Sequence, residues 1–386
     1  MSASEMAIHP VGLTSLASLK HAIVAVVYVS EGANLSILSA LRTVVETATK
    51  AHQQQQQQYA IASQSTITHV PSAKFITMFS DPHYNRTSIV IAGGQPAAVA
   101  ATARELVAAA LAALPPLTSH DATHPRIGLV DHVSMAPLYT HEASSASANE
   151  GSNAGFNMDD AAAAACQLSN ALATDHGLPV MLYGEARPHM GLSPRTLAET
   201  RRQTPYFRAK AKNSGLQSDA TSKDVSDSSS SNGSPDDDLW SGVTPDLGGP
   251  TINPAVGVCC VGAVPLVLNY NVRLTTSDRN IAAACTAAVR TRAAKSNIDG
   301  RAAASASQGL PWVEALPLVH AGGHFEVACN LLNPSVSPPA RVLDAIEKSL
   351  AQQGCGVTVE EAYTIGMQVE EICAKLVEPP PSATQK

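Results

Sequence analysis

The segment "AKFITMFSDPHYNRTSIVIAG" (residues 73–93) determines how the first half of the chain folds. Two apolar runs, 73–79 and 87–93, lie on either side of a polar turn. Each run has the length of a strand, and an Asp-Pro pair followed by Asn is typical of a turn. The segment therefore predicts two neighbouring strands joined by a short connection.

Elements on both sides of this pair complete an order that occurs twice. The elements expected in the first half are a strand at 21–29, a helix at 34–52, the strand pair, a helix at 96–114, a strand after Arg126, a helix at 158–175, a strand at 178–184 and a basic helix near 194–203. The elements expected in the second half are a strand at 264–274, a helix from Ser277, strands at 310–318 and 323–331, a helix at 338–353 and a strand at 356–363. The repeated order βαββαβ is that of the ferredoxin-like arrangement. We expect an α+β fold of two tandem ferredoxin-like subdomains, with antiparallel sheets that face a central cleft or tunnel.

Polar, low-complexity stretches divide the chain. Their composition cannot repay the entropy of ordering, so we expect them to be flexible. The expected divisions are an N-terminal subdomain at 19–212 with flexible insertions near 53–72 and 141–156, a disordered linker at 213–243, and a C-terminal subdomain at 244–378.

Composition excludes several classes of protein. A net charge of −7 without a long single-sign run argues against a general nucleic-acid binder. The seven cysteines contain no C-x-x-C pair, which favours buried thiols in a reducing compartment. No apolar run approaches the ~18 residues of a membrane span. We expect a cytoplasmic protein without nucleic-acid or membrane partners, with organellar targeting left open by the hydroxyl-rich N-terminal segment.

The segment "HDATHPRIG" (120–128) concentrates groups that can do chemistry. His120 and His124 are four residues apart, but Pro125 disfavours helix at His124 and no third ligand follows at a recognisable spacing, so we expect no metal. A neutral histidine is suited to take a proton from a nitrogen nucleophile and return it. Arg126 would share its strand face and offer a fork to a carboxylate. A plain loop with a salt bridge remains the alternative here.

Other polar residues end predicted strands. Asp81 could hold a cationic or NH-bearing group and Arg86 an anion, although a simple turn explains both equally well. Tyr183 and Gly184 end a buried strand, and glycine permits close approach of backbone to a ligand. The chain lacks the glycine-rich motifs of dinucleotide folds and P-loops.

These segments together resemble the formiminotransferases, the folate-dependent domain of formiminotransferase-cyclodeaminase and its stand-alone relatives. The motifs that carry the resemblance are "YVSEG" (28–32), "YNRT" (84–87), "HDATHPRIG" (120–128), "LPVMLYGEA" (178–186), "RTLAETRR" (195–202), "PDLGGP" (245–250), "VGAVPLVLNYNV" (261–272) and "VACNLLNP" (327–334). They occur in family order and cover nearly the whole chain outside the insertions.

The resemblance implies a glutamate formimidoyltransferase-like activity in a homodimer. A formimino group would pass from N-formimino-L-glutamate to N5 of tetrahydrofolate, which serves as co-substrate, with no metal. His124 takes the role of the catalytic base, and Asp81 is placed near N5. Tyr183, Gly184 and Asn271 are implied in substrate or folate binding, and His120 is a further expected contact. Arg126 as a carboxylate anchor is our inference from its chemistry.

The chain also departs from the family pattern. The usual N-F-S-E-G reads "YVSEG", with Tyr28 in place of asparagine, and the closing strand reads "EEAYTIGMQ" where many relatives carry S-x-L-V-G. Two alternatives therefore remain: an enzyme that handles 5-formyltetrahydrofolate, or a folate-binding relative without catalysis. No cyclodeaminase domain is expected.

Overall fold

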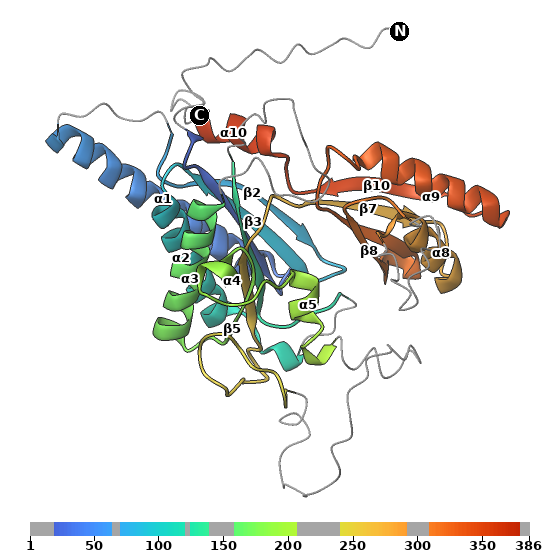
Figure 1. Cartoon of the computed structure of the whole chain (residues 1–386), viewed down its shortest axis with the longest axis horizontal. Coiled ribbons are helices and arrows are strands. Elements are labelled where there is room, and N and C mark those ends of the chain that lie inside the picture. Colours follow the sequence, from blue (N-terminus) through green and yellow to red (C-terminus); the bar gives the residue numbers. More distant parts are fainter. Residues whose placement is uncertain are drawn as a thin grey trace, which may run out of the picture.

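The computed structural model shows an α+β protein with two β-sheets (Figure 1). It describes residues 19–63, 70–119, 124–138, 158–206, 240–291 and 309–378. The predicted α+β class is confirmed. We call the six-stranded sheet with its helices the first unit, and the four-stranded sheet with its helices the second unit.

The first sheet has the strand order β2-β3-β1-β4-β6-β5. Its strands are β1 (Ile23–Val29), β2 (Lys74–Asp81), β3 (Arg86–Gly93), β4 (Val130–Pro137), β5 (Val180–Gly184) and β6 (Cys259–Ala263). The first four strands pair antiparallel, whereas β6 runs parallel to both β4 and β5. The sheet is therefore mixed, and the expectation of a purely antiparallel sheet was wrong for this unit.

Helices α1 (Leu35–Ser63), α2 (Pro96–Ala113) and α3 (Asp159–His176) cover one face of the first sheet (Figure 1). Alternate residues of β1, such as Val27 and Val29, pack into that helix-covered core because side chains alternate across a strand. Val24 belongs to the core on the opposite face, which is partly covered by α10 (Val369–Val377). The middle of that opposite face carries the polar residues described below.

Helix α1 extends further than the sequence predicted, and helix α2 is strongly apolar. Helix α1 continues through the glutamine tract to Ser63, and the Gln53 and Gln56 amides donate to backbone carbonyls at 3.3 Å, so this part of the expected insertion is helical. Helix α2 is long and apolar enough to cross a membrane, and eight of its residues are buried in the core of the first unit. The expected insertion at 141–156 and most of the linker at 213–243 lie outside the described residues.

The second sheet is antiparallel, with the order β10-β7-β9-β8. Its strands are β7 (Leu268–Leu274), β8 (Val313–Val319), β9 (Phe325–Leu331) and β10 (Val359–Ile365). Helices α8 (Arg279–Val289) and α9 (Pro339–Gln353) pack on one of its faces. They lie away from the first unit, so the helix-free faces of both sheets are on the inner side of the molecule (Figure 1).

The strand pairing differs from the expected domain limits in two places. Strand β6 belongs to the first sheet although 244–263 was assigned to the C-terminal subdomain, and α10 returns from the second unit to pack on the first. Pro265 separates β6 from β7, because proline cannot donate to a strand ladder. The strand expected at 264–274 consequently begins at Leu268. Two short helices complete the first unit, α4 (Ala186–His189) and α5 (Leu197–Arg201).

Candidate functional site

The loop that carries His124 is fixed by backbone hydrogen bonds to the segment before β6. The Val258 N–H donates to the carbonyl of Ile127 at 2.8 Å, and the Leu129 N–H donates to that of Val256 at 2.9 Å. Gly128 packs so closely on this segment that an added Cβ would meet the carbonyl of Val258. The loop leads into β4 at Val130, later than the strand start expected near Arg126.

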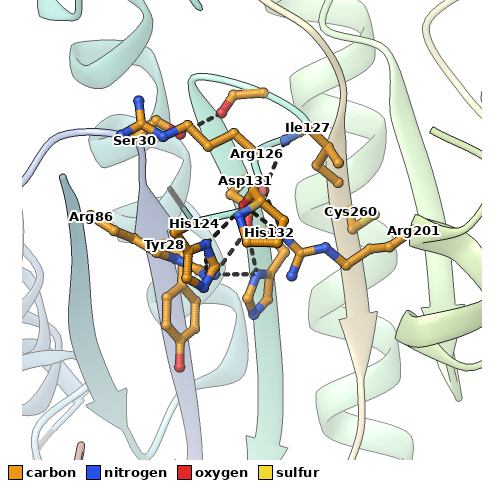
Figure 2. Close-up of polar contacts among 12 residues, drawn as sticks. Tyr28, Ser30, Arg86, His124, Arg126, Ile127, Asp131, His132, Arg201 and Cys260 are labelled. Carbon is orange, nitrogen blue, oxygen red and sulfur yellow. Dashed lines mark hydrogen bonds and ion pairs between the residues drawn. The ribbon is translucent and has the colours of Figure 1, made fainter. Parts of the chain in front are cut away.

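Asp131 is the centre of the polar cluster behind this loop (Figure 2). It is 1% exposed, and its carboxylate accepts hydrogen bonds from Arg86 Nη2 at 2.9 Å and Arg201 Nη2 at 2.7 Å. It also accepts the Ile127 N–H at 3.1 Å. Burial would raise the pKa of Asp131, but the neighbouring arginines hold it well below its ordinary value. The cluster therefore contains an ionised carboxylate.

His124 lies beside this ion-pair network. Its Nδ1 is 2.8 Å from the carbonyl oxygen of Pro125, and Arg86 Nη1 lies 2.8 Å from its Nε2 and 3.1 Å from its Nδ1. A carbonyl can only accept, so Nδ1 carries the hydrogen, and Nε2 is the nitrogen left to accept from Arg86. Burial, Arg86 and Arg201 together hold the pKa of His124 well below its ordinary value. His124 is thus neutral near pH 7, with its basic nitrogen covered by Arg86.

Tyr28 and His132 lie next to this cluster, on the neighbouring strands β1 and β4 of the helix-free face. Their rings stack with centroids 4.1 Å apart, and the Arg86 guanidinium lies over the Tyr28 ring at 4.5 Å. Burial lowers the pKa of His132 to about 4 despite its contact with Asp131. The Tyr28 hydroxyl donates to Asn269 of β7 at 2.8 Å. Tyr28, which stands where the family pattern has asparagine, therefore connects the two units.

Arg126 does not share a strand face with His124 as the sequence suggested. It lies in the loop, and its Nη2 donates to the carbonyls of Tyr84 and Asn85 at 3.2 and 2.9 Å. Its Nε and Nη1 atoms are buried and have no hydrogen-bond partner among the described residues. Two of the three nitrogens of this guanidinium therefore have no partner among the described residues.

Asp81 lies at a second polar cluster, where the turn between β2 and β3 meets the second unit. Its Oδ1 accepts the backbone N–H groups of His83 and Tyr84, and its Oδ2 is 3.2 Å from Nε2 of His320. The Tyr84 ring is in edge contact with the rings of His124 and His320, with centroids 5.3 and 4.9 Å away. One tyrosine thus connects the two clusters.

Asn271 belongs to this second cluster and contacts a buried carboxylate. Glu326 is fully buried on β9 and accepts hydrogen bonds from Asn271 Nδ2 at 2.7 Å, Tyr84 Oη at 2.9 Å and Tyr363 Oη at 2.8 Å. Burial raises the pKa of Glu326, although the two tyrosine hydroxyls oppose this effect. The structure therefore brings Asp81 and Asn271 to one junction between the units.

Tyr183 and Gly184 lie in packed backbone instead of an open cleft. Tyr183 is 1% exposed, and its hydroxyl donates to the carbonyl of Val133 at 3.3 Å. Gly184 has φ +59°, and an added Cβ would meet the carbonyl of Ala263 on β6. Close approach of two strands accounts for this glycine. His120 lies outside the described residues.

Sequence reasoning missed several members of these clusters. It did not single out Asp131, Arg201, His320 or Glu326. Asp131 could have been found as a charged residue in the apolar strand "LVDHV", since charges are rarely buried without partners. Within the described ranges no group of three or more His, Cys, Asp or Glu residues could hold a metal ion.

Comparison with known proteins identifies the family. Residues 22–264 match the formiminotransferase domain, N-terminal subdomain. The chain is 29% identical over 300 residues to a formiminotransferase cyclodeaminase-like protein of Arabidopsis thaliana, covering 74% of this chain and 80% of the relative. It is 23% identical over 306 residues to a glutamate formimidoyltransferase of Thermoplasma acidophilum, covering 79% of this chain and 81% of the relative. The resemblance drawn from the eight motifs is confirmed, and the chain belongs to the formiminotransferase family.

Proposed function

We propose that this protein transfers a formimino group from N-formimino-L-glutamate to N5 of tetrahydrofolate, with His124 as the group that takes and returns the proton. The family membership and the name of the Thermoplasma relative support the substrate class. The strand orders β2-β3-β1-β4 and β10-β7-β9-β8 support two ferredoxin-like units whose helix-free faces border the substrate site.

The observation that carries the proposal is the neutral His124 between Arg86 and Pro125. The attacking N5 must lose a proton as its bond to the formimino carbon forms. The departing glutamate nitrogen must gain a proton as its bond to that carbon breaks. One neutral imidazole can serve both steps, because it receives the first proton and delivers it to the leaving nitrogen. No net proton is then consumed by the enzyme.

Because of the arginines around His124, the pKa of this histidine should depend on whether substrate is bound. Both substrates carry carboxylates, and guanidinium groups bind carboxylates through paired hydrogen bonds. In the free protein burial lowers the pKa of His124, and Arg86 and Arg201 lower it further. A bound carboxylate would offset their charge and draw Arg86 from the Nε2 lone pair, so His124 would become a stronger base once substrate is present. Arg126, with two unpartnered nitrogens among the described residues, is the expected anchor for that carboxylate.

A turnover assay tests this proposal. Purified protein is mixed with tetrahydrofolate and N-formimino-L-glutamate, and the absorbance of the folate product is followed. Wild type and His52→Ala should turn over equally. His52 lies on α1, which covers the face of the first sheet opposite to His124. His124→Ala should lose activity by roughly 100-fold or more, as expected for a general acid–base group. Folate binding without turnover in the wild type, or unchanged turnover in His124→Ala, would contradict the proposal.

A further inference from the structure

His320 presents a buried ring nitrogen that none of the described residues contacts through a hydrogen bond. The residue follows β8 and is 9% exposed, and its Nε2 contacts the Asp81 carboxylate. A carboxylate accepts, so in a neutral imidazole Nε2 carries the hydrogen and Nδ1 carries the lone pair. Nδ1 is enclosed and has no hydrogen-bond partner within the part of the chain that the structure describes. Buried polar atoms of this kind normally have a partner.

Asp81 holds this ring in place. Its Oδ1 is engaged by two backbone N–H groups of its own turn and its Oδ2 by His320, which fixes both the orientation and the tautomer of the imidazole. Nδ1 of His320 is thus a polar atom at this junction that has no partner among the described residues. The second unit contributes it, whereas His124 comes from the first.

The location of His320 relates it to the proposed reaction. Its ring and that of His124 both contact the ring of Tyr84, at 4.9 and 5.3 Å between centroids. The two histidines therefore border the same tyrosine ring, one from each unit. Because Nδ1 of His320 is an acceptor, a ligand group that contacts it must be a donor, such as an N–H.

We propose that Nδ1 of His320 accepts a hydrogen bond from the amidine N–H of the formimino donor, with Asp81 as a positioning residue. The identity of this ligand rests on the proposed function. The formimino group is an amidine, and its N–H groups are the feature that separates N-formimino-L-glutamate from L-glutamate. His320 would thus recognise the one-carbon unit, while the arginines near His124 recognise the carboxylates.

Binding measurements on the full chain test this inference. Isothermal titration calorimetry is performed with N-formimino-L-glutamate and, separately, with L-glutamate. His320→Gln retains an amide that can donate to Asp81 but lacks a group at the Nδ1 position. We expect it to bind N-formimino-L-glutamate roughly five- to tenfold more weakly, the effect of one net hydrogen bond, and L-glutamate unchanged. The matched control is His176→Gln at the exposed end of α3, on the helix-covered side of the first sheet, which should bind as wild type.

A second variant separates recognition from structural support. Asp81→Asn keeps an oxygen for the backbone N–H groups of the turn, but its amide donates to Nε2 and so moves the imidazole hydrogen to Nδ1. The protein should stay folded by circular dichroism and thermal melting, yet lose affinity for N-formimino-L-glutamate as His320→Gln does. His320→Gln with wild-type affinity, an equal loss for L-glutamate, or a folded Asp81→Asn with wild-type affinity would overturn the inference.

The outcomes also distinguish this inference from the proposed function. Selective loss of N-formimino-L-glutamate binding in a protein that shows no turnover would contradict the transferase proposal alone. Turnover in the wild type together with unchanged binding and KM in His320→Gln would contradict the role of His320 alone. Absence of N-formimino-L-glutamate binding by the wild type would overturn both.

Discussion

Arg86 Nη1 lies 2.8 Å from Nε2 and 3.1 Å from Nδ1 of His124, so the guanidinium contacts the ring nitrogen that could accept a proton. The same guanidinium donates to Asp131 through Nη2 at 2.9 Å. Arg86 therefore couples the candidate base to a buried ion-pair network. This relationship makes the basicity of His124 depend on what else Arg86 binds.

Asp131→Asn is expected to destabilise the protein by about 3–5 kcal/mol, because removal of the carboxylate charge leaves Arg86 and Arg201 buried without compensation. Urea unfolding followed by circular dichroism measures the change. Asp175→Asn serves as a matched control, since Asp175 pairs with Arg104 at a site where both side chains are more than 40% exposed, and should change stability by less than about 1 kcal/mol. Equal effects of the two substitutions would contradict the assignment of Asp131 as the centre of the cluster.

Gly184→Ala is expected to disturb folding, although sequence reasoning placed Gly184 at a ligand. Gly177 provides the control, because both glycines have φ +59° but an added Cβ meets the carbonyl of Ala263 only at position 184. Gly177→Ala should cost about 1–2 kcal/mol from backbone conformation alone. Gly184→Ala should cost about 1–3 kcal/mol more, from overpacking. Thermal melts compare the two, and equal costs would show that strand packing does not explain Gly184.

Arg126→Gln should weaken binding of N-formimino-L-glutamate by roughly 10- to 100-fold, the effect of losing a hydrogen bond to a charged group. Its two unpartnered nitrogens among the described residues are the basis for this expectation. KM should rise while kcat changes little, because a carboxylate anchor acts in ground state and transition state alike. Arg104→Gln, at an exposed pair, is the control. A fall in kcat with unchanged KM would argue against an anchor.

Stability should fall between pH 6.5 and about 4 because of His132. Burial lowers the pKa of His132 to about 4 in the folded protein, while the unfolded chain has the ordinary value near 6.5. Within this window the unfolded state binds more protons, so the free energy of unfolding decreases as pH falls, by up to about 1.4 kcal/mol per pH unit for one such group. Urea titrations at pH 7, 5.5 and 4.5 measure this slope. It should be smaller in His132→Gln, and an equal slope in both proteins would contradict the assignment.

Much of the fold could be predicted because long apolar runs and amphipathic helices have local signatures. The pair β2 and β3 and the helix α9 were found within two residues of their observed bounds. Strand β6 was missed because "CCVGA" lies in a glycine-rich run next to Pro265, and its partners β4 and β5 are far away in the sequence. The extension of α1 was missed because a glutamine repeat was taken as flexible, although glutamine is a good helix former.

The candidate site was predictable only in part, because only some of its residues belong to local sequence motifs. His124 was identified from its local motif and from the chemistry of imidazole. The contacts of Asp131 with Arg201, 70 residues away, and of Asp81 with His320, 239 residues away, depend on tertiary packing that no local pattern encodes. Tyr183 was expected at a ligand because it ends a strand, but its hydroxyl is satisfied by the backbone of Val133.

The most direct test of the central claim is the pH dependence of turnover with N-formimino-L-glutamate and tetrahydrofolate. The acidic limb of kcat/KM reports a base of the free enzyme, and that of kcat reports the same base in the complex. Burial lowers the pKa of His124, and Arg86 and Arg201 lower it further. A bound substrate carboxylate would offset the arginines, so we predict a limb below pH 6.5 for kcat/KM and a limb at higher pH for kcat. Residual turnover of His124→Gln should show neither limb. Absence of turnover, a kcat limb at or below that of kcat/KM, or persistence of both limbs in His124→Gln would contradict the account.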